Sequence, residues 1–216
     1  VCTRGADGRV AAYFDSPRYG YTVGDASDPE VYAGRLKRFD RRILFIKPGF
    51  VVIHDLVASA KSAVRCDWML HAVVPVQIDA VKKTFAVECE NAALRGRFFS
   101  PAGVDLSVKT GFPVEPVNRY STDPVPPDKY FPEWVLCSTP PEPAVETEFL
   151  AAMQIQRLGS QAEPEGRIAP IEADGAHGVR LQCGEEDHWV IFRKRGTSGP
   201  IRSGGLETDG EAAAVE

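Results

Sequence analysis

Residues 41–58 read RRILFIKPGFVVIHDLVA, and this stretch decides the fold. Residues 41–47 and 50–58 are rich in β-branched and aliphatic side chains, as strands require, and Pro48-Gly49 between them signals a turn. The sequence therefore predicts an antiparallel hairpin. If Lys47 faces Phe50 across the turn, Arg42 lies opposite Asp55 at the open end. The pairs nearer the turn are then Ile46 with Val51, Phe45 with Val52, and Leu44 with Ile53.

A third strand is predicted at residues 65–73, after the polar sequence 59–62, and we expect it to complete an antiparallel meander. Successive side chains of a strand point to opposite faces. Alternation therefore places Cys66, Trp68, Leu70 and Ala72 on the core side. It places His71 on the opposite side.

The rest of the chain shows the same sequence pattern, in which short predicted strands are separated by turn signals. Strands at spacings of about 8–12 residues predict an all-β, antiparallel β-sandwich, here a large two-sheet sandwich of about a dozen strands. Residues 146–158 fit both a helix and a strand, and the surrounding pattern favours a strand. We expect one domain over residues 1–196. We expect residues 197–216 to be a flexible or partly ordered tail with at most a short strand near Ile201.

Composition excludes several classes of protein. The chain has 216 residues, with 25 basic and 30 acidic side chains and a formal net charge of −5, which argues against nucleic acid as a main partner. No apolar run approaches the roughly 18 residues of a membrane helix. The N-terminus has no signal-peptide plan and no Met, so we expect a fragment or a processed piece.

The five cysteines are scattered and have no CxxC spacing. An odd, dispersed set favours free buried thiols over a disulfide framework or a zinc ribbon. The set is Cys2, Cys66, Cys89, Cys137 and Cys183.

Five sequence elements follow one another in a fixed order over about fifty residues. They are Gly24-Asp25-Ala26-Ser27, Tyr32, Arg42 with Lys47-Pro48, Val51-Val52-Ile53-His54-Asp55, and Trp68-Met69-Leu70-His71. This order resembles the C-terminal β-sandwich domain of the heparinase II/III-like polysaccharide lyases. The resemblance implies β-elimination on a uronic-acid-containing polysaccharide and a periplasmic or secreted location.

The resemblance also implies a division of labour. In that family an Asn, a Tyr and a His on an N-terminal helical toroid carry the chemistry, and this chain has no counterpart of that domain. We therefore assign no catalytic residue and predict that the chain alone is not catalytic. We expect it to support the helical domain, to wall the substrate cleft and to self-associate as a homodimer. The rival functions are a stand-alone carbohydrate-binding module, which predicts a line of exposed aromatic side chains, and a β-domain without a sugar ligand. A large exposed apolar patch would favour the lyase over both.

The histidines are the candidate metal ligands. The resemblance implies that His71 helps to hold a structural zinc together with a His and an Asp from an upstream segment. No His precedes His54 in this chain, so we expect no cofactor within it and zinc only in an intact parent protein. His54 lies on the apolar face of its strand and is predicted to be a hydrogen-bonded core or interface histidine. His177 and His188 flank a late hairpin and are predicted to be solvated.

The densest basic cluster lies between Arg35 and Arg42. Arginine guanidinium groups match carboxylate and sulfate groups, so Arg35 and Arg38 are candidate residues for binding an acidic polysaccharide. The alternative is a solvated sheet edge in which Arg42 pairs with Asp55.

Overall fold

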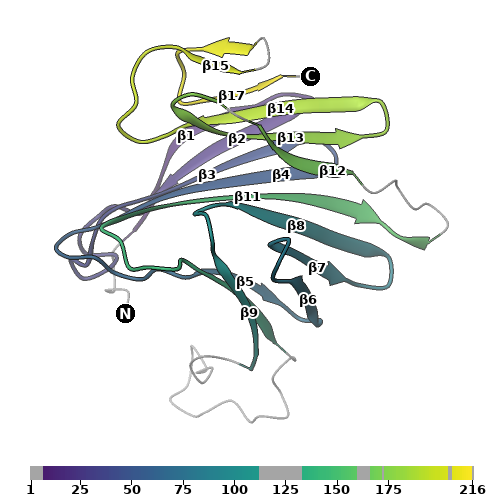
Figure 1. Ribbon diagram of the computed structural model, residues 1–216, viewed down its shortest axis with the longest axis horizontal. Coiled ribbons are helices and arrows are strands. Elements are labelled where there is room, and N and C mark those ends of the chain that lie inside the picture. The colour runs from purple at the N-terminus through teal and green to yellow at the C-terminus, as the bar shows by residue number, and fades with distance from the viewer. Residues whose placement is uncertain (1–6, 112–132, 160–165, 172, 204–205, 216) are drawn as a thin grey trace.

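The chain forms an all-β, antiparallel fold, which confirms the predicted β-sandwich class (Figure 1). The structure is a computed structural model that describes residues 7–111, 133–159, 166–171, 173–203 and 206–215. These residues contain seventeen strands, more than the dozen expected. The strands are β1 (Arg9–Asp15), β2 (Tyr19–Asp25), β3 (Leu36–Ile46), β4 (Phe50–Ser59), β5 (Trp68–Ala72), β6 (Val76–Asp79), β7 (Thr84–Glu88), β8 (Ala92–Ser100), β9 (Asp105–Thr110), β10 (Trp134–Thr139), β11 (Glu146–Arg157), β12 (Arg167–Ile171), β13 (Ala176–Cys183), β14 (Glu186–Arg193), β15 (Ile201–Ser203), β16 (Leu206–Thr208) and β17 (Ala212–Val215).

One eight-stranded sheet, in the order β1-β2-β3-β4-β11-β8-β7-β6, spans the molecule. Its central strands β4 and β11 bury side chains on both faces. Val52 and Leu150 enter one hydrophobic core, whereas Phe149 and Met153 enter a second core on the opposite face. The large sheet therefore separates two cores, and the parity of a residue decides which core receives its side chain.

Two small sheets cover opposite faces of the large one, above and below it in Figure 1. The sheet β12-β13-β14-β17 closes the first core with residues such as Val179 and Phe192. The sheet β5-β10-β9 closes the second core with Trp68 and Leu136. The sandwich is thus three layers deep along its middle, where the sequence predicted two.

The hairpin β3-β4 is present, but its register differs by one residue from the prediction. Ile46 pairs with Phe50, so the loop has three residues, 47–49, and Arg41 lies opposite Asp55. The expected pair of Arg42 with Asp55 is therefore wrong. Arg42 instead donates a hydrogen bond from Nη2 to Oε2 of Glu211, at 2.8 Å.

The predicted meander is also wrong. The third strand exists as β5, and its core side is the expected one, because Trp68 is buried and Met69 and His71 are exposed. However, β5 pairs with β10 of the small sheet, while β4 pairs with β3 and β11. Local patterning identified the strand but not its distant partner.

The end of the chain contains more strand than the sequence led us to expect. The predicted strand near Ile201 is present as β15, and β16 and β17 follow it. Strand β17 joins the small sheet beside β14, and Ile201 is buried against Ala176 and Ile191. Residues 146–157 form strand β11, as predicted. The proline-rich segment 112–132 lies outside the described residues.

Four of the five cysteines lie in the described part of the chain, and all four are free thiols, as predicted. The sequence also predicted that these thiols are buried. Cys137 is buried, whereas Cys66 and Cys183 are half-buried and Cys89 is exposed. In the described ranges, no helix has the length and apolar character needed to cross a membrane.

Gly96 on β8 provides a test of the packing between the large sheet and the second core. A Cβ atom on Gly96 would lie 2.3 Å from Cζ of Phe85 and 2.9 Å from Cγ of Met153. We expect Gly96→Ala to lower the free energy of unfolding by about 1–3 kcal/mol, the usual effect of overpacking. Urea denaturation measures it. The matched control is Gly24→Ala on β2, where the nearest atom lies at 4.0 Å, and an equal loss in both variants would contradict the packing.

Candidate functional site

Most of the elements that carried the family resemblance converge on one groove. The groove lies between the large sheet and β5 and has a volume of about 660 Å³. Tyr32, Asp55, Trp68 and His71 all line it. The other lining residues are Arg35, Leu36, Phe39, Arg41, Val57, Val64, Arg65, Cys66, Asp67, Met69 and Phe149. We call this feature the arginine groove because three arginines line it.

Arg41 is the fixed part of the arginine groove. Its guanidinium donates from Nε to Oδ1 of Asp55 at 2.8 Å and from Nη2 to Oδ2 at 2.7 Å, a two-point contact. The guanidinium also lies 5.8 Å from the centre of the Trp68 ring. The hydrogen bond with Asp55 raises the pKa of Arg41 against the effect of burial. Asp55 is almost fully buried, so its two hydrogen bonds hold the Arg41 guanidinium in a fixed position at the side of the groove. Both Arg41 donors in this contact are therefore already used within the protein.

The structure separates the two arginines that the sequence proposed as sugar ligands. Arg35 lies in the arginine groove, is exposed, and makes no ion pair within the described residues. Arg38 lines a second groove of about 500 Å³, which also contains Arg42 and Arg195. Arg38 is engaged there by Asp40. Arg35 is therefore the better placed of the two for an anionic ligand.

His71 is an exposed residue that lines the arginine groove, and its Nδ1 is hydrogen-bonded to Oε1 of Glu133. The zinc site implied by the resemblance needs two further ligands. Among the residues that the structure describes, no group of three ligand-type side chains includes His71. The described residues therefore offer His71 without the two partners that the resemblance implies, and zinc binding at His71 in an intact parent protein stays a prediction.

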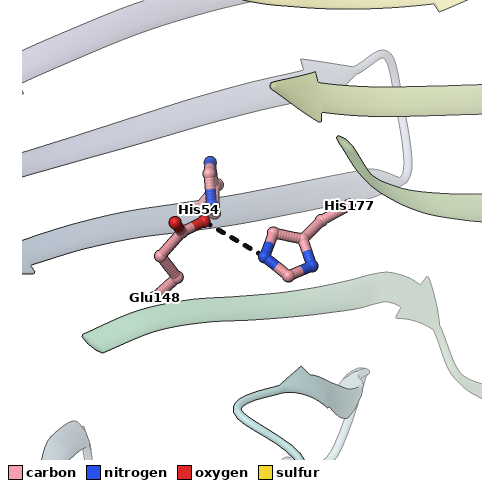
Figure 2. Close-up of side chains that lie close together, drawn as sticks. All are labelled: His54, Glu148 and His177. Carbon is pink, nitrogen blue, oxygen red and sulfur yellow. Dashed lines mark hydrogen bonds and ion pairs between the residues drawn. The ribbon is translucent and has the colours of Figure 1, made fainter. Parts of the chain in front are cut away.

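A different cluster brings two histidines and a glutamate together between the sheets (Figure 2). His54 comes from β4 and Glu148 from the neighbouring strand β11, whereas His177 comes from β13 in the facing small sheet. Oε2 of Glu148 lies 3.2 Å from Nε2 of His54 and 3.1 Å from Nε2 of His177. We call these three residues the His-Glu-His cluster.

Burial and hydrogen bonding act against each other in the His-Glu-His cluster. Burial acts to raise the pKa of Glu148, but hydrogen bonds from His177, His54 and the backbone N–H of Arg195 outweigh it, so the pKa falls well below its usual range. Burial lowers the pKa of His54, although the bond to Glu148 opposes this. Glu148 is therefore ionised, and His54 is held in its neutral form.

The sequence predicted part of this cluster. His54 is buried and hydrogen-bonded, as expected. The prediction that His177 and His188 are solvated is wrong. His177 faces Glu148 across the two sheets, and His188 is buried with its ring edge-on to Tyr19, the ring centres 6.3 Å apart. One signal was available, because Glu148 shares the inward parity of Leu150 and Ala152 on β11.

Comparisons with known proteins show which solved structures have a similar fold. No protein-family model matches the chain, and no curated protein matches it in sequence. Among solved structures, the heparinase III BT4657 gene product is similar with a TM-score of 0.55 and 11% identity, covering 97% of this chain and 27% of that one. The heparan sulfate lyase HepC from Pedobacter heparinus is similar with a TM-score of 0.59 and 12% identity, covering 86% and 28%.

The chain thus spans about a quarter of the length of these enzymes. At such low identity the likeness shows the fold. It confirms the resemblance to a β-sandwich domain of the heparinase II/III-like lyases at the level of the fold.

Glu148 provides a test of the cluster as a structural element. In Glu148→Ala, Nε2 of His54 loses its partner in a fully buried position, which is expected to lower the free energy of unfolding by about 1–3 kcal/mol. Urea denaturation in the presence of a chelator measures this. The matched control is Glu146→Ala on the same strand, whose half-exposed side chain pairs with Arg195 at the surface and should matter little. Equal losses would show that the buried contact is not important.

Proposed function

We propose that this chain is the β-sandwich portion of a heparinase II/III-like lyase that cleaves a uronic-acid-containing polysaccharide by β-elimination. This portion supports the substrate cleft and is not catalytic alone. The observation that carries the proposal is the match of nearly the whole chain to about a quarter of two heparinase structures. The convergence of Tyr32, Asp55, Trp68 and His71 on the arginine groove supports it.

An uncovered apolar surface on β1 supports a role as one part of a larger assembly. All seven residues of β1 are exposed, and three of them are large apolar side chains, Val10 (69%), Tyr13 (73%) and Phe14 (56%). Tyr13 and Phe14 point to opposite faces of the strand, so a partner that buries both has to cover the free edge of β1. We propose that a helical toroid domain of the same protein covers it. A second copy of the chain is the alternative occupant.

The arginine groove supplies the proposed contact with substrate. Arg35 extends from the turn before β3 into a groove that also contains the aromatic rings of Tyr32 and Trp68. A guanidinium binds carboxylate or sulfate. Trp68 is buried beneath Arg41, so of these two rings only that of the half-buried Tyr32 is available beside Arg35. Since the substrate class is extracellular polysaccharide, the proposal includes a periplasmic or secreted location.

A stand-alone carbohydrate-binding module is the second candidate function. It predicts a line of exposed aromatic side chains on one sheet face. Within the described residues, the strongly exposed aromatic side chains are Tyr13 and Phe14. These are adjacent in β1 and therefore point to opposite faces, which favours the lyase portion.

The direct test compares two proteins, the full open reading frame that contains this chain and the 216-residue chain alone. Each is incubated with heparan sulfate, other glycosaminoglycans and alginate, and the unsaturated uronic acid produced by β-elimination is followed by its ultraviolet absorbance. We expect cleavage by the longer protein only. Cleavage by the chain alone would overturn the division of labour. Absence of cleavage of every polymer by the longer protein would overturn the lyase.

Arg35 tests the proposed groove. We expect Arg35→Ala to weaken binding of the preferred polysaccharide by about fivefold, the effect of losing an ion pair worth about 1 kcal/mol. Affinity electrophoresis at two salt concentrations measures the loss, which should shrink at high salt. The matched control is Arg202→Ala, an exposed arginine on β15. Equal weakening in both variants would indicate non-specific charge attraction and contradict the groove.

A further inference from the structure

The His-Glu-His cluster has the composition of a metal site. Its three ligand-type atoms, one per residue, all lie within 4.8 Å of one another, and no other group of this kind occurs in the described ranges. Two imidazole nitrogens with one carboxylate oxygen form the donor set of three-ligand zinc sites that keep a fourth position open. The set also excludes hard cations such as Mg²⁺ and Ca²⁺ as the preferred occupant, because these favour oxygen ligands.

The spacing of the atoms suits zinc. Zinc lies about 2.0–2.2 Å from imidazole nitrogen and carboxylate oxygen, so neighbouring ligand atoms of a tetrahedral site lie about 3.4 Å apart. Oε2 of Glu148 is 3.2 Å from Nε2 of His54 and 3.1 Å from Nε2 of His177. These two separations match, and the three ligand atoms all lie within 4.8 Å of one another.

The surroundings hold the ligands in place. The ring of His54 is fully buried and packs on Phe192, with ring centres 5.1 Å apart. The backbone N–H of Arg195 donates to Oε1 of Glu148, which leaves Oε2 directed at the two rings (Figure 2). Outer hydrogen bonds of this kind orient metal ligands. The nearby cation Arg42 is paired with Glu211, so its charge is largely compensated.

The cluster is also accessible. The side chains of Glu148 and His177 each keep 21% of their surface exposed, so an ion can enter and a water molecule can occupy a fourth position. Nδ1 of His54 is buried and has no hydrogen-bond partner among the described residues. This atom lacks a partner whether or not it carries the proton. The energetic cost of the unpaired atom is therefore present in both the metal-free and the metal-bound form, and it does not favour one over the other.

We propose that His54, Glu148 and His177 bind one zinc ion that links the large sheet to the small sheet β12-β13-β14-β17. The alternative is a purely hydrogen-bonded cluster in which the carboxylate accepts from both rings. This inference does not depend on the proposed lyase function, because it concerns only side chains of this chain. The fourth position is open to water or to an oxygen atom of an external ligand.

The experiment uses the tag-free 216-residue chain, stripped with a chelator and then dialysed. Isothermal titration calorimetry with Zn²⁺ is expected to show one site per chain, and Zn²⁺ is expected to raise the melting temperature. Mg²⁺ and Ca²⁺ at the same concentration should do neither. Co²⁺ should give the visible absorption of a tetrahedral nitrogen and oxygen site. Absence of one-to-one Zn²⁺ binding would overturn the proposal and favour the hydrogen-bonded cluster.

Three variants assign the ligands. His177→Ala and Glu148→Gln are expected to weaken Zn²⁺ binding at least tenfold, and a retained β-sheet circular dichroism spectrum shows that each variant folds. If Glu148→Gln does not fold, His177→Ala alone decides, since its ring is partly exposed. The control is His71→Ala, which removes the exposed histidine paired with Glu133 and should leave the affinity unchanged. Unchanged affinity in His177→Ala, or a loss in His71→Ala, would overturn the proposal. Either result leaves the lyase test unaffected.

Discussion

The structure depends on the burial of both faces of β4 and β11. Each strand alternates between two separate cores, so Val52 and Ile53, although adjacent, pack in different layers. Full burial of an aliphatic or aromatic side chain stabilises the folded state by roughly 1.5–3 kcal/mol, and here both faces of the sheet contribute. A slip of one residue would send every side chain of the strand to the wrong core. The register is therefore held far more tightly than by cross-strand hydrogen bonds alone.

This constraint explains which parts of the fold could be predicted from the sequence. Alternating apolar residues located most of the strands, including β11 in the ambiguous stretch 146–158, because a strand's periodicity is local. The hairpin register was missed because Pro48-Gly49 fits a loop of two or three residues equally well. Choosing three moves Asp55 from Arg42 to Arg41. The pairing of β5 with β10 was missed because no local pattern specifies a partner so distant in the chain.

The candidate sites were predictable to a similar degree. Alternation placed His54 inward, and the structure confirms this placement. The basic character of Arg35 marked it as a candidate anion ligand; Arg35 lines the arginine groove, and its role as a ligand stays a prediction. The His-Glu-His cluster could not be predicted from the sequence, because its third residue, His177, lies on a different sheet. Only the packing of β13 over β4 brings His177 to Glu148. The charged residue at an inward position of β11 was the one clue that a polar partner had to lie opposite.

The position of β1 at the end of the large sheet has a practical consequence. Its only hydrogen-bonded neighbour among the described strands is β2, so its outer side presents a row of backbone groups that no described strand pairs, interrupted by a register shift between Val10 and Ala12. Such an edge is a template onto which another chain can add a strand, and proteins usually block it with charges, bulges or covering segments. Here the row is flanked by Tyr13 and Phe14. Samples of the chain handled alone should therefore be kept dilute, and precipitation on concentration would reflect this bare edge and not a failure to fold.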